Sequence, residues 1–213
     1  MLEKINWLGH SSFRITSGFI IYVDPWKIND FVKADLIFIT HSHFDHMSLP
    51  DINSLIKPGT IIIAPESAKD ELSEINCQVQ FVNPGDKIII KGVPIEVIAA
   101  YNKDRDYHPK SKLWVGYVIE VDGERLYFAG DTDYISEMSD LEDIYAAFLP
   151  ISGTYTMDVK AAVKAALDIH PRYAIPTHYG DIIGENEDAN EFIDLIRKED
   201  PSIEALKKES EIL

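Results

Sequence analysis

The chain of 213 residues contains one segment that is dense in potential metal ligands, His41-Ser42-His43-Phe44-Asp45-His46. It directly follows the apolar run 36–39, which predicts a buried strand. Three imidazoles and a carboxylate gathered beside a buried strand would cost desolvation energy unless a cation compensates for it. We therefore predict a metal site in the loop that leaves this strand.

The spacing within this segment favours two metal ions. Alternate residues of an extended chain face the same side, so His41, His43 and Asp45 can converge only if the chain turns. His46 then points in another direction. Four ligands from one short loop can hardly complete a single tetrahedron, so the pattern suits two adjacent cations that take further ligands from elsewhere.

Three later residues follow predicted strands and can supply those ligands: His108, Asp131 and His178. Sheets commonly display functional groups where their strands end. Each residue alone also has an ordinary structural interpretation, His108 as a loop residue, Asp131 as a turn former and His178 as a cap or surface group. Together with the first segment they indicate a binuclear site, in which a carboxylate can bridge two cations.

The elements that must position these residues are short strands followed by amphipathic helices. Strands are predicted at 19–23, 36–39, 60–64, 87–90, 95–99, 115–121, 126–128 and 173–177. Lys91-Gly92 and Asp122-Gly123 predict antiparallel hairpins. A helix is expected from Val159 to Ile169, with Thr156 as its N-cap and Pro171 beyond its end, and a second helix around 189–196. Residues 203–213 are ambiguous.

This order of elements predicts an α/β sandwich, with helices outside packed sheets. The absence of repeats and linkers favours a single domain over residues 1–213. The formal net charge of −16 disfavours nucleic acid as a partner. Without a signal-peptide pattern or a membrane-length apolar run, we expect a soluble, cytoplasmic protein with no membrane partner. Cys77, which has no partner motif, is expected to be an ordinary thiol.

The ligand pattern, with Gly130-Asp131-Thr132 and Pro176-Thr177-His178, resembles the metallo-β-lactamase superfamily over nearly the whole chain. The motifs Trp7-Leu8-Gly9-His10-Ser11-Ser12-Phe13, Ala100-Tyr101-Asn102, His108-Pro109-Lys110 and Gly153-Thr154-Tyr155-Thr156-Met157 resemble a branch of small bacterial and archaeal metal-dependent hydrolases. The ascorbate-6-phosphate lactonases are similar at a greater distance.

The resemblance implies an αββα sandwich of two mixed β-sheets flanked by helices. It also implies that His41, His43 and His108 hold one metal, that Asp45, His46 and His178 hold the other, and that Asp131 bridges them. Members with redox iron tend to replace histidines of the first segment by carboxylates, and this chain keeps those histidines, which favours hydrolysis. The short spacings from His46 to His108 and from Asp131 to His178 leave no room for the cap domain of the nuclease branch.

The expected activity is hydrolysis of a lactone or ester-like bond in a small anionic metabolite by a metal-bridging hydroxide, with Asp45 and Asp131 as catalytic residues. Phosphodiester hydrolysis and a non-catalytic, metal-bearing binding module are the alternatives. The cofactors expected are two divalent ions, with zinc favoured over manganese or iron. The oligomeric state leaves no readable signal.

Several polar residues near the ligands have less defined roles. His10 either borders the site or satisfies a local hydrogen bond, and it stays outside the proposed ligand set. His170 is expected to be a charge at a helix C-terminus. Lys103, Arg105 and Lys110 are expected to be ordinary surface cations, with local attraction of an anion as the alternative. Tyr155 and Thr156 could line the pocket. The candidate hydroxyl donors to the ligands are those of Thr40, Ser42, Thr132 and Thr177.

Overall fold

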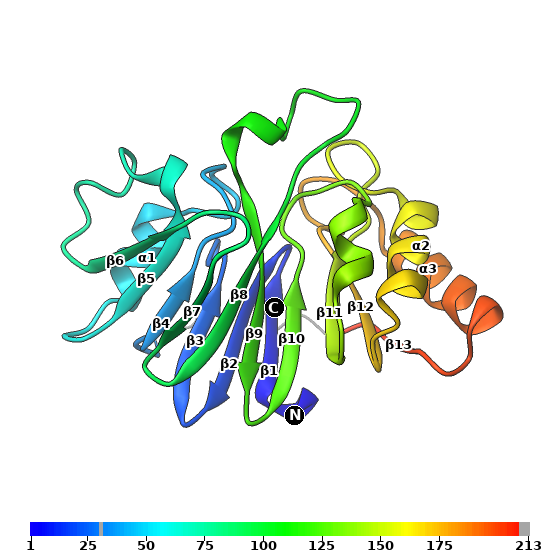
Figure 1. The fold of residues 1–213 in the computed structure, drawn as a ribbon, viewed down its shortest axis with the longest axis horizontal. Coiled ribbons are helices and arrows are strands. Elements are labelled where there is room, and N and C mark those ends of the chain that lie inside the picture. The colour runs from blue at the N-terminus through cyan, green and yellow to red at the C-terminus, as the bar shows by residue number, and fades with distance from the viewer. Residues whose placement is uncertain (30–31, 209–213) are drawn as a thin grey trace. The chain divides into compact units, whose positions relative to one another are not determined.

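A computed structural model describes residues 1–29 and 32–208 of the chain, so the end of the ambiguous C-terminal segment, 209–213, lies outside the described residues. Two compact units divide the structure: residues 1–83 with Lys208 in the first, and Pro84–Lys207 in the second. Each unit is built around its own sheet (Figure 1). The single domain predicted over 1–213 stays a prediction.

The first unit contains a mixed six-stranded sheet whose strands follow one another in chain order. Pairing is antiparallel from β1 to β3 and parallel from β3 to β6. A helix, α1 (Leu49–Leu55), lies between β4 and β5 in the sequence, and its Ile52 and Leu55 are buried. The strands are β1 (Ile5–Gly9), β2 (Ser12–Ser17), β3 (Phe19–Val23), β4 (Leu36–Phe38), β5 (Ile61–Pro65) and β6 (Gln78–Val82).

Parallel pairing makes β4 a buried central strand, as its apolar sequence predicts. All three of its residues are buried, and the neighbouring strands β3 and β5 both run parallel to it. Ile37 and Ile39 pack with Ile52 and Leu55 of α1 in one hydrophobic cluster. The ligand-rich segment therefore starts from a strand that is held on both edges and covered by a helix.

The second unit contains a mixed seven-stranded sheet in the order β13-β12-β11-β10-β9-β8-β7. Its strands from β7 to β10 pair antiparallel, and those from β10 to β13 pair parallel. The strands are β7 (Lys87–Ile90), β8 (Val93–Ala99), β9 (Val115–Val121), β10 (Glu124–Phe128), β11 (Ile144–Pro150), β12 (Tyr173–Thr177) and β13 (Glu204–Ala205).

The two hairpin predictions are confirmed. Lys91-Gly92 joins β7 to β8, and Asp122-Gly123 joins β9 to β10, both in antiparallel register. All four turn residues have positive φ, between 52° and 82°. Positive φ at both central residues is the geometry that matches the twist of a hairpin, and it explains the glycine in each pair.

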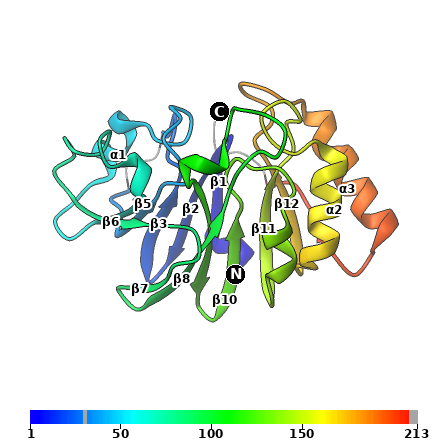
Figure 2. The same ribbon diagram turned by 45° about the horizontal axis from the view of Figure 1, so that its top comes forward.

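Two helices cross between the parallel strands of this unit: α2 (Val159–Ile169) between β11 and β12, and α3 (Asn186–Glu199) between β12 and β13. They lie against each other beside the parallel part of the sheet (Figures 1 and 2). The predicted span of α2 is confirmed, but its predicted N-cap is wrong. Asp158 caps the helix by accepting from Ala161 N at 2.8 Å, whereas the Thr156 hydroxyl bonds within the preceding loop.

Short 3-10 turns complete the described structure: η1 (Leu2–Lys4), η2 (Glu66–Ala68), η3 (Lys110–Lys112) and η4 (Ser136–Asp140). No helix among residues 1–29 and 32–208 is both long and apolar enough to cross a membrane.

Candidate metal centre

In the first unit, the chain turns directly after β4, as convergence of the ligand-rich segment requires. The amides of His46 and Met47 both donate to His43 O, at 3.0 and 2.8 Å. This turn brings Nε2 of His41 to within 3.1 Å of Nδ1 of His43. Nε2 of His46 lies 3.9 Å from Oδ2 of Asp45. The turn therefore forms two pairs of ligand atoms.

Asp24, at the end of β3, fixes the orientation of two of these histidines. Its carboxylate accepts from Thr40 N at 2.8 Å, from Thr40 Oγ1 at 2.6 Å and from Nδ1 of His46 at 2.7 Å. Because Thr40 Oγ1 donates to Asp24, it is an acceptor for Nδ1 of His41 at 3.0 Å. Both rings therefore carry a proton on Nδ1 and present Nε2 with its lone pair, the arrangement of a metal-binding histidine.

Asp24 is fully buried, and its charge is balanced locally. Burial raises the pKa of the Asp24 carboxyl, while the contacts with His46 and Thr40 act in the opposite direction. A buried carboxylate is tolerated when several donors surround it. Asp24 was not among the predicted site residues, although an acidic residue directly after the β-rich run 19–23 was a signal for it.

His10, whose role the sequence left open, contacts a candidate ligand. It follows β1 and is almost fully buried, and its Nε2 lies 3.1 Å from Oδ2 of Asp45. Its ring makes T-shaped contacts with Trp26 and His46, at centroid distances of 5.3 and 5.8 Å. His10 thus orients the Asp45 carboxylate.

In the second unit, one carboxylate oxygen faces two histidines. Oδ2 of Asp131 lies 3.2 Å from Nε2 of His108 and 3.1 Å from Nε2 of His178. Asp131 follows β10, His108 lies in the connection from β8 to β9, and His178 follows β12. All three side chains are buried. The structure thus brings together three predicted ligands that are far apart in the sequence.

Asn102 and Tyr155 hold the ring of His108. Nδ1 of His108 donates to Asn102 Oδ1 at 3.1 Å and to the Tyr155 carbonyl at 3.2 Å. Since both partners are acceptors, Nδ1 carries the proton, and Nε2, which faces Asp131, carries the lone pair. The Asn102 amide also donates to Tyr155 O at 2.9 Å and to Asp133 Oδ1 at 3.2 Å.

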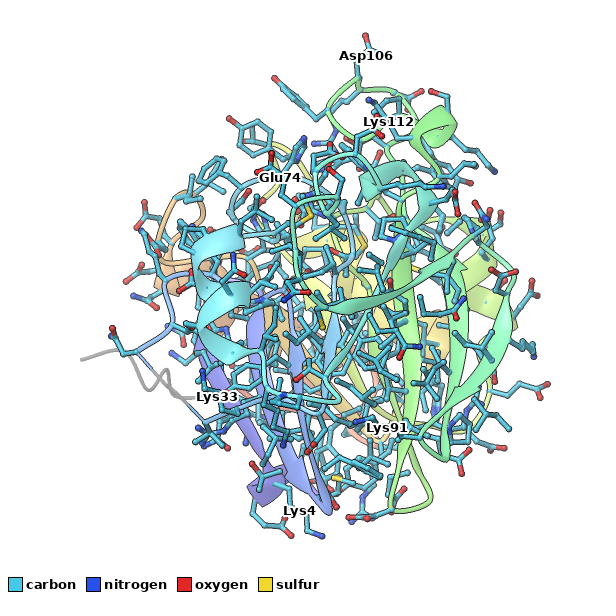
Figure 3. The ribbon with its side chains drawn as sticks, turned by 90° about the vertical axis from the view of Figure 1, so that its left-hand side faces the viewer. Lys4, Lys33, Glu74, Lys91, Asp106 and Lys112 are labelled. Atoms are coloured by element: carbon cyan, nitrogen blue, oxygen red, sulfur yellow. The ribbon has the colours of Figure 1, made fainter. Side chains whose placement is uncertain are left out.

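Arg105 binds the loop of His108 to the loop before α2. Its guanidinium donates to the carbonyls of Gly153, Thr154 and Thr156, at 2.6 to 2.9 Å, and pairs with the Asp133 carboxylate. Figure 3 shows Asp106, the next residue, at the outer tip of this loop. The expectation that Arg105 is an ordinary surface cation is therefore wrong, because three carbonyls and a carboxylate hold its partly exposed side chain in place.

The two lysines that were grouped with Arg105, Lys103 and Lys110, also make contacts within the second unit. Lys103 places Nζ over the Tyr134 ring, 5.3 Å from its centroid. Lys110 donates to the Tyr101 hydroxyl at 3.2 Å and pairs with Glu137 at 3.3 Å. These contacts raise the pKa of Lys110, the hydrogen bond to Tyr101 most of all.

The predicted hydroxyl donors differ in what they contact. The Thr40 hydroxyl contacts a candidate ligand, but it accepts from His41 and donates to Asp24. Thr132 instead binds the backbone of Tyr101, on both its amide and its carbonyl. Within residues 1–29 and 32–208, neither Ser42 nor Thr177 makes a side-chain hydrogen bond to a candidate ligand. His170 lies at the C-cap of α2, the predicted position, and its Nε2 is 3.2 Å from Oδ2 of Asp200.

One candidate ligand and two residues that contact ligands leave their strands through left-handed backbone. His10 has φ of 48° after β1, Asp24 has φ of 44° after β3, and His178 has φ of 59° after β12. This conformation costs a residue with a Cβ roughly 1–2 kcal/mol. The rest of each unit must stabilise these turns, which direct the side chains away from the course of their strands.

The donor sets of both units fit divalent metal ions. Imidazole nitrogens and carboxylate oxygens are the ligands that zinc, manganese and iron accept. Two ligands of one tetrahedral zinc ion lie roughly 3.3 Å apart, given bonds of about 2.0 Å. The separations of 3.1 to 3.2 Å for His41 with His43, and for His108 and His178 with Asp131, are close to this value.

Comparisons with known proteins agree with these features. The family model described as "Beta-lactamase superfamily domain" matches residues 4–178. A UPF0173 metal-dependent hydrolase of Thermoplasma acidophilum is 35% identical over 193 residues, 83% of each chain. Another from Thermococcus onnurineus is 33% identical over 192 residues, 84% of this chain and 85% of the relative.

A solved structure shows the same fold. The putative metal-dependent hydrolase from Parabacteroides distasonis is 36% identical, with a TM-score of 0.86, over 97% of this chain and 93% of its own. The chain therefore belongs to the metallo-β-lactamase superfamily, and within it to the metal-dependent hydrolases. The predicted fold class, two mixed sheets flanked by helices in the αββα metallo-β-lactamase fold, is confirmed.

Proposed function

We propose that this hydrolase holds two divalent metal ions and cleaves a lactone or ester-like bond in a small anionic metabolite. The observation that carries the proposal is the approach of one Asp131 oxygen to two histidines, His108 and His178. A carboxylate oxygen in that position can serve both ions. The family match runs through both units, so we also propose that 1–213 acts as one hydrolase domain.

The proposed ligand set is the one expected from sequence. It exceeds what a single four-coordinate ion can use, which supports two ions, with zinc favoured and manganese or iron as alternatives. Its members are His41, His43 and His108 for one ion, Asp45, His46 and His178 for the other, and Asp131 for both.

The side chains around the ligands have separable tasks in this proposal. Bound divalent ions acidify a water molecule and polarise the substrate's reacting oxygen. Asp24 and Thr40 keep His41 and His46 in the tautomer that presents Nε2. Asp45, held at Oδ2 by His10, is the proposed group that orients the attacking water molecule. Asp131 is the ligand that both ions would share. Because the acidified water molecule supplies the nucleophile, no side chain of the protein has to attack the substrate.

The charge balance supports a small anionic substrate. The chain carries a formal net charge of −16, which opposes a long polyanion that must make many contacts. A single carboxylate or phosphate instead interacts mainly with the metal ions at short range, where salt screens little. We therefore propose a small-molecule substrate and neither nucleic acid nor membrane as a partner. The cytoplasmic location stays a prediction.

A substrate panel tests this function. Chromogenic esters, lactones and phosphodiesters are incubated with protein loaded with zinc, manganese or iron(II), and with metal-stripped protein. We expect metal-dependent turnover of the esters or lactones, abolished by His178→Ala and kept by His170→Ala, a histidine outside the ligand set. Turnover of phosphodiesters alone would support the alternative reaction, and turnover of none would support a binding module.

A further inference from the structure

Phe44 is an exposed aromatic residue inside the ligand-rich segment. It lies between His43 and Asp45 in the sequence, yet 68% of its surface is exposed. Its ring makes a T-shaped contact with Trp26 at a centroid distance of 5.9 Å. The contact fixes the ring while most of its surface faces solvent.

Trp26 joins this exposed ring to the candidate centre. It is 8% exposed, and it packs against His10, whose Nε2 contacts Asp45. Lys27 places its ammonium group over the Trp26 ring, 4.1 Å from the centroid. Aromatic rings and the ammonium group of Lys27 thus lie close to Asp45, the proposed ligand that also orients the water molecule.

Each unit carries exposed apolar side chains on its ligand-bearing loops. Among the described residues, four of the six large apolar side chains that are exposed lie in loops with a candidate ligand: Phe44, Tyr107, Leu113 and Ile182. Tyr107 directly precedes His108 and contacts Tyr155 at a centroid distance of 4.7 Å. Scattered surface apolar residues need no explanation, but concentration on the ligand loops does.

We propose that the exposed ring of Phe44, supported from beneath by Trp26, is an aromatic platform that binds an apolar, aromatic arm of the substrate next to the hydrolysed bond. The proposal deepens the function above and rests on it. Metal ions attract any small anion, so discrimination between anions must come from contacts beyond the ligands. A fixed, solvent-exposed ring gains free energy when an aromatic arm covers it and loses little entropy in doing so. The substrate class is therefore an anionic ester or lactone with an aryl arm.

Two substrates that differ only in this arm test the platform. We compare kcat/KM for the mono-4-nitrophenyl esters of 3-phenylglutaric acid and glutaric acid, which each carry one carboxylate and share a leaving group, on zinc-loaded protein. The wild type should prefer the phenyl arm, and Phe44→Ala should lower the ratio about 10-fold, the scale of a lost apolar pocket contact. Phe44→Tyr should keep the preference. Ile89→Ala is the matched control, because Ile89 is 71% exposed on β7 without a ligand nearby, and it should change neither rate.

A binding measurement separates the platform from catalysis. Isothermal titration calorimetry gives the affinities of zinc-loaded protein for phenylacetate and acetate. Tighter binding of phenylacetate than of acetate, lost in Phe44→Ala, would support the platform even if the protein hydrolyses no ester. Absence of ester hydrolysis would overturn the proposed function and leave the platform standing. Equal affinities for the two anions, or a preference that Phe44→Ala leaves unchanged, would overturn the platform.

Discussion

Replacement of Arg105 by alanine should weaken metal binding without touching a ligand. The guanidinium holds three backbone carbonyls of the loop before α2 and the carboxylate of Asp133. Asp133 in turn accepts from Asn102, which holds His108 on both its amide and its ring. Arg105→Ala removes the first link of this chain of contacts.

The magnitude follows from the number and exposure of these hydrogen bonds. A bond to a charged group contributes about 1.5–3 kcal/mol when buried, and solvent reduces this toward 1 kcal/mol or less at exposed sites. The side chains of Arg105 and Asp133 are 30% and 16% exposed, so we discount the sum. We expect a loss of about 2–4 kcal/mol in the free energy of unfolding. Loss of a partner behind a metal ligand typically lowers metal affinity about 10- to 100-fold.

Two measurements distinguish positioning from bulk stability. Thermal unfolding of the metal-free protein measures the loss of folding stability. Competition for zinc with a chromophoric chelator measures the loss of metal affinity. Arg105→Lys should keep the charge but lose the fork that reaches several carbonyls, with an intermediate result in both assays. Arg125→Ala is the control, because Arg125 pairs with Glu96 in the same unit, outside the ligand loops. Unchanged zinc affinity in Arg105→Ala would refute the reasoning, whatever the stability.

Three further predictions concern the metal centre and the second sheet. Asp131→Ala should lower kcat/KM far more than His10→Ala, because Asp131 contacts two ligands while His10 only orients Asp45; equal losses would contradict this ranking. Elemental analysis of metal-replete protein should give close to two ions per chain, falling to none with a loss of activity after chelation, and a value of one would argue for a mononuclear site. Gly116→Ala should lower the free energy of unfolding by about 1–3 kcal/mol, because a Cβ would lie 2.6 Å from the Ala129 carbonyl oxygen; a thermal midpoint like that of the wild type would refute it.

The sequence predicted those parts of the fold that have a clear local cause. Apolar runs marked β3, β4 and β12, and the two hairpins followed from residue pairs that tolerate positive φ. The unpredicted strands include β2, which carries polar residues, and β11, whose apolar run could not be distinguished from other buried segments. The N-cap of α2 was misplaced because Thr156 and Asp158 both suit the position, and only the bond to Ala161 N decides between them.

For the metal centre, the sequence predicted the ligands but not the residues that hold those ligands in position. Four ligands in six residues left few alternatives, and each of the other three followed a strand. Asp24, Asn102 and Arg105 act through pairs of residues that are between 6 and 51 positions apart, and no hydrophobic period or short motif reveals such pairs. The sequence also left His10 open, because its partner is 35 residues away.

The left-handed turns at His10, Asp24 and His178 bear on how the protein acquires its metal. Their strain is held by the packed sheets, so the donor atoms are in position in the polypeptide before any ion arrives. A zinc finger, by contrast, folds only around its ion. We therefore expect metal ions to load and exchange in the native state, without refolding of the chain. We expect the identity of the bound metal to follow the ion that the surroundings supply, and the same folded chain to accept another ion after chelation.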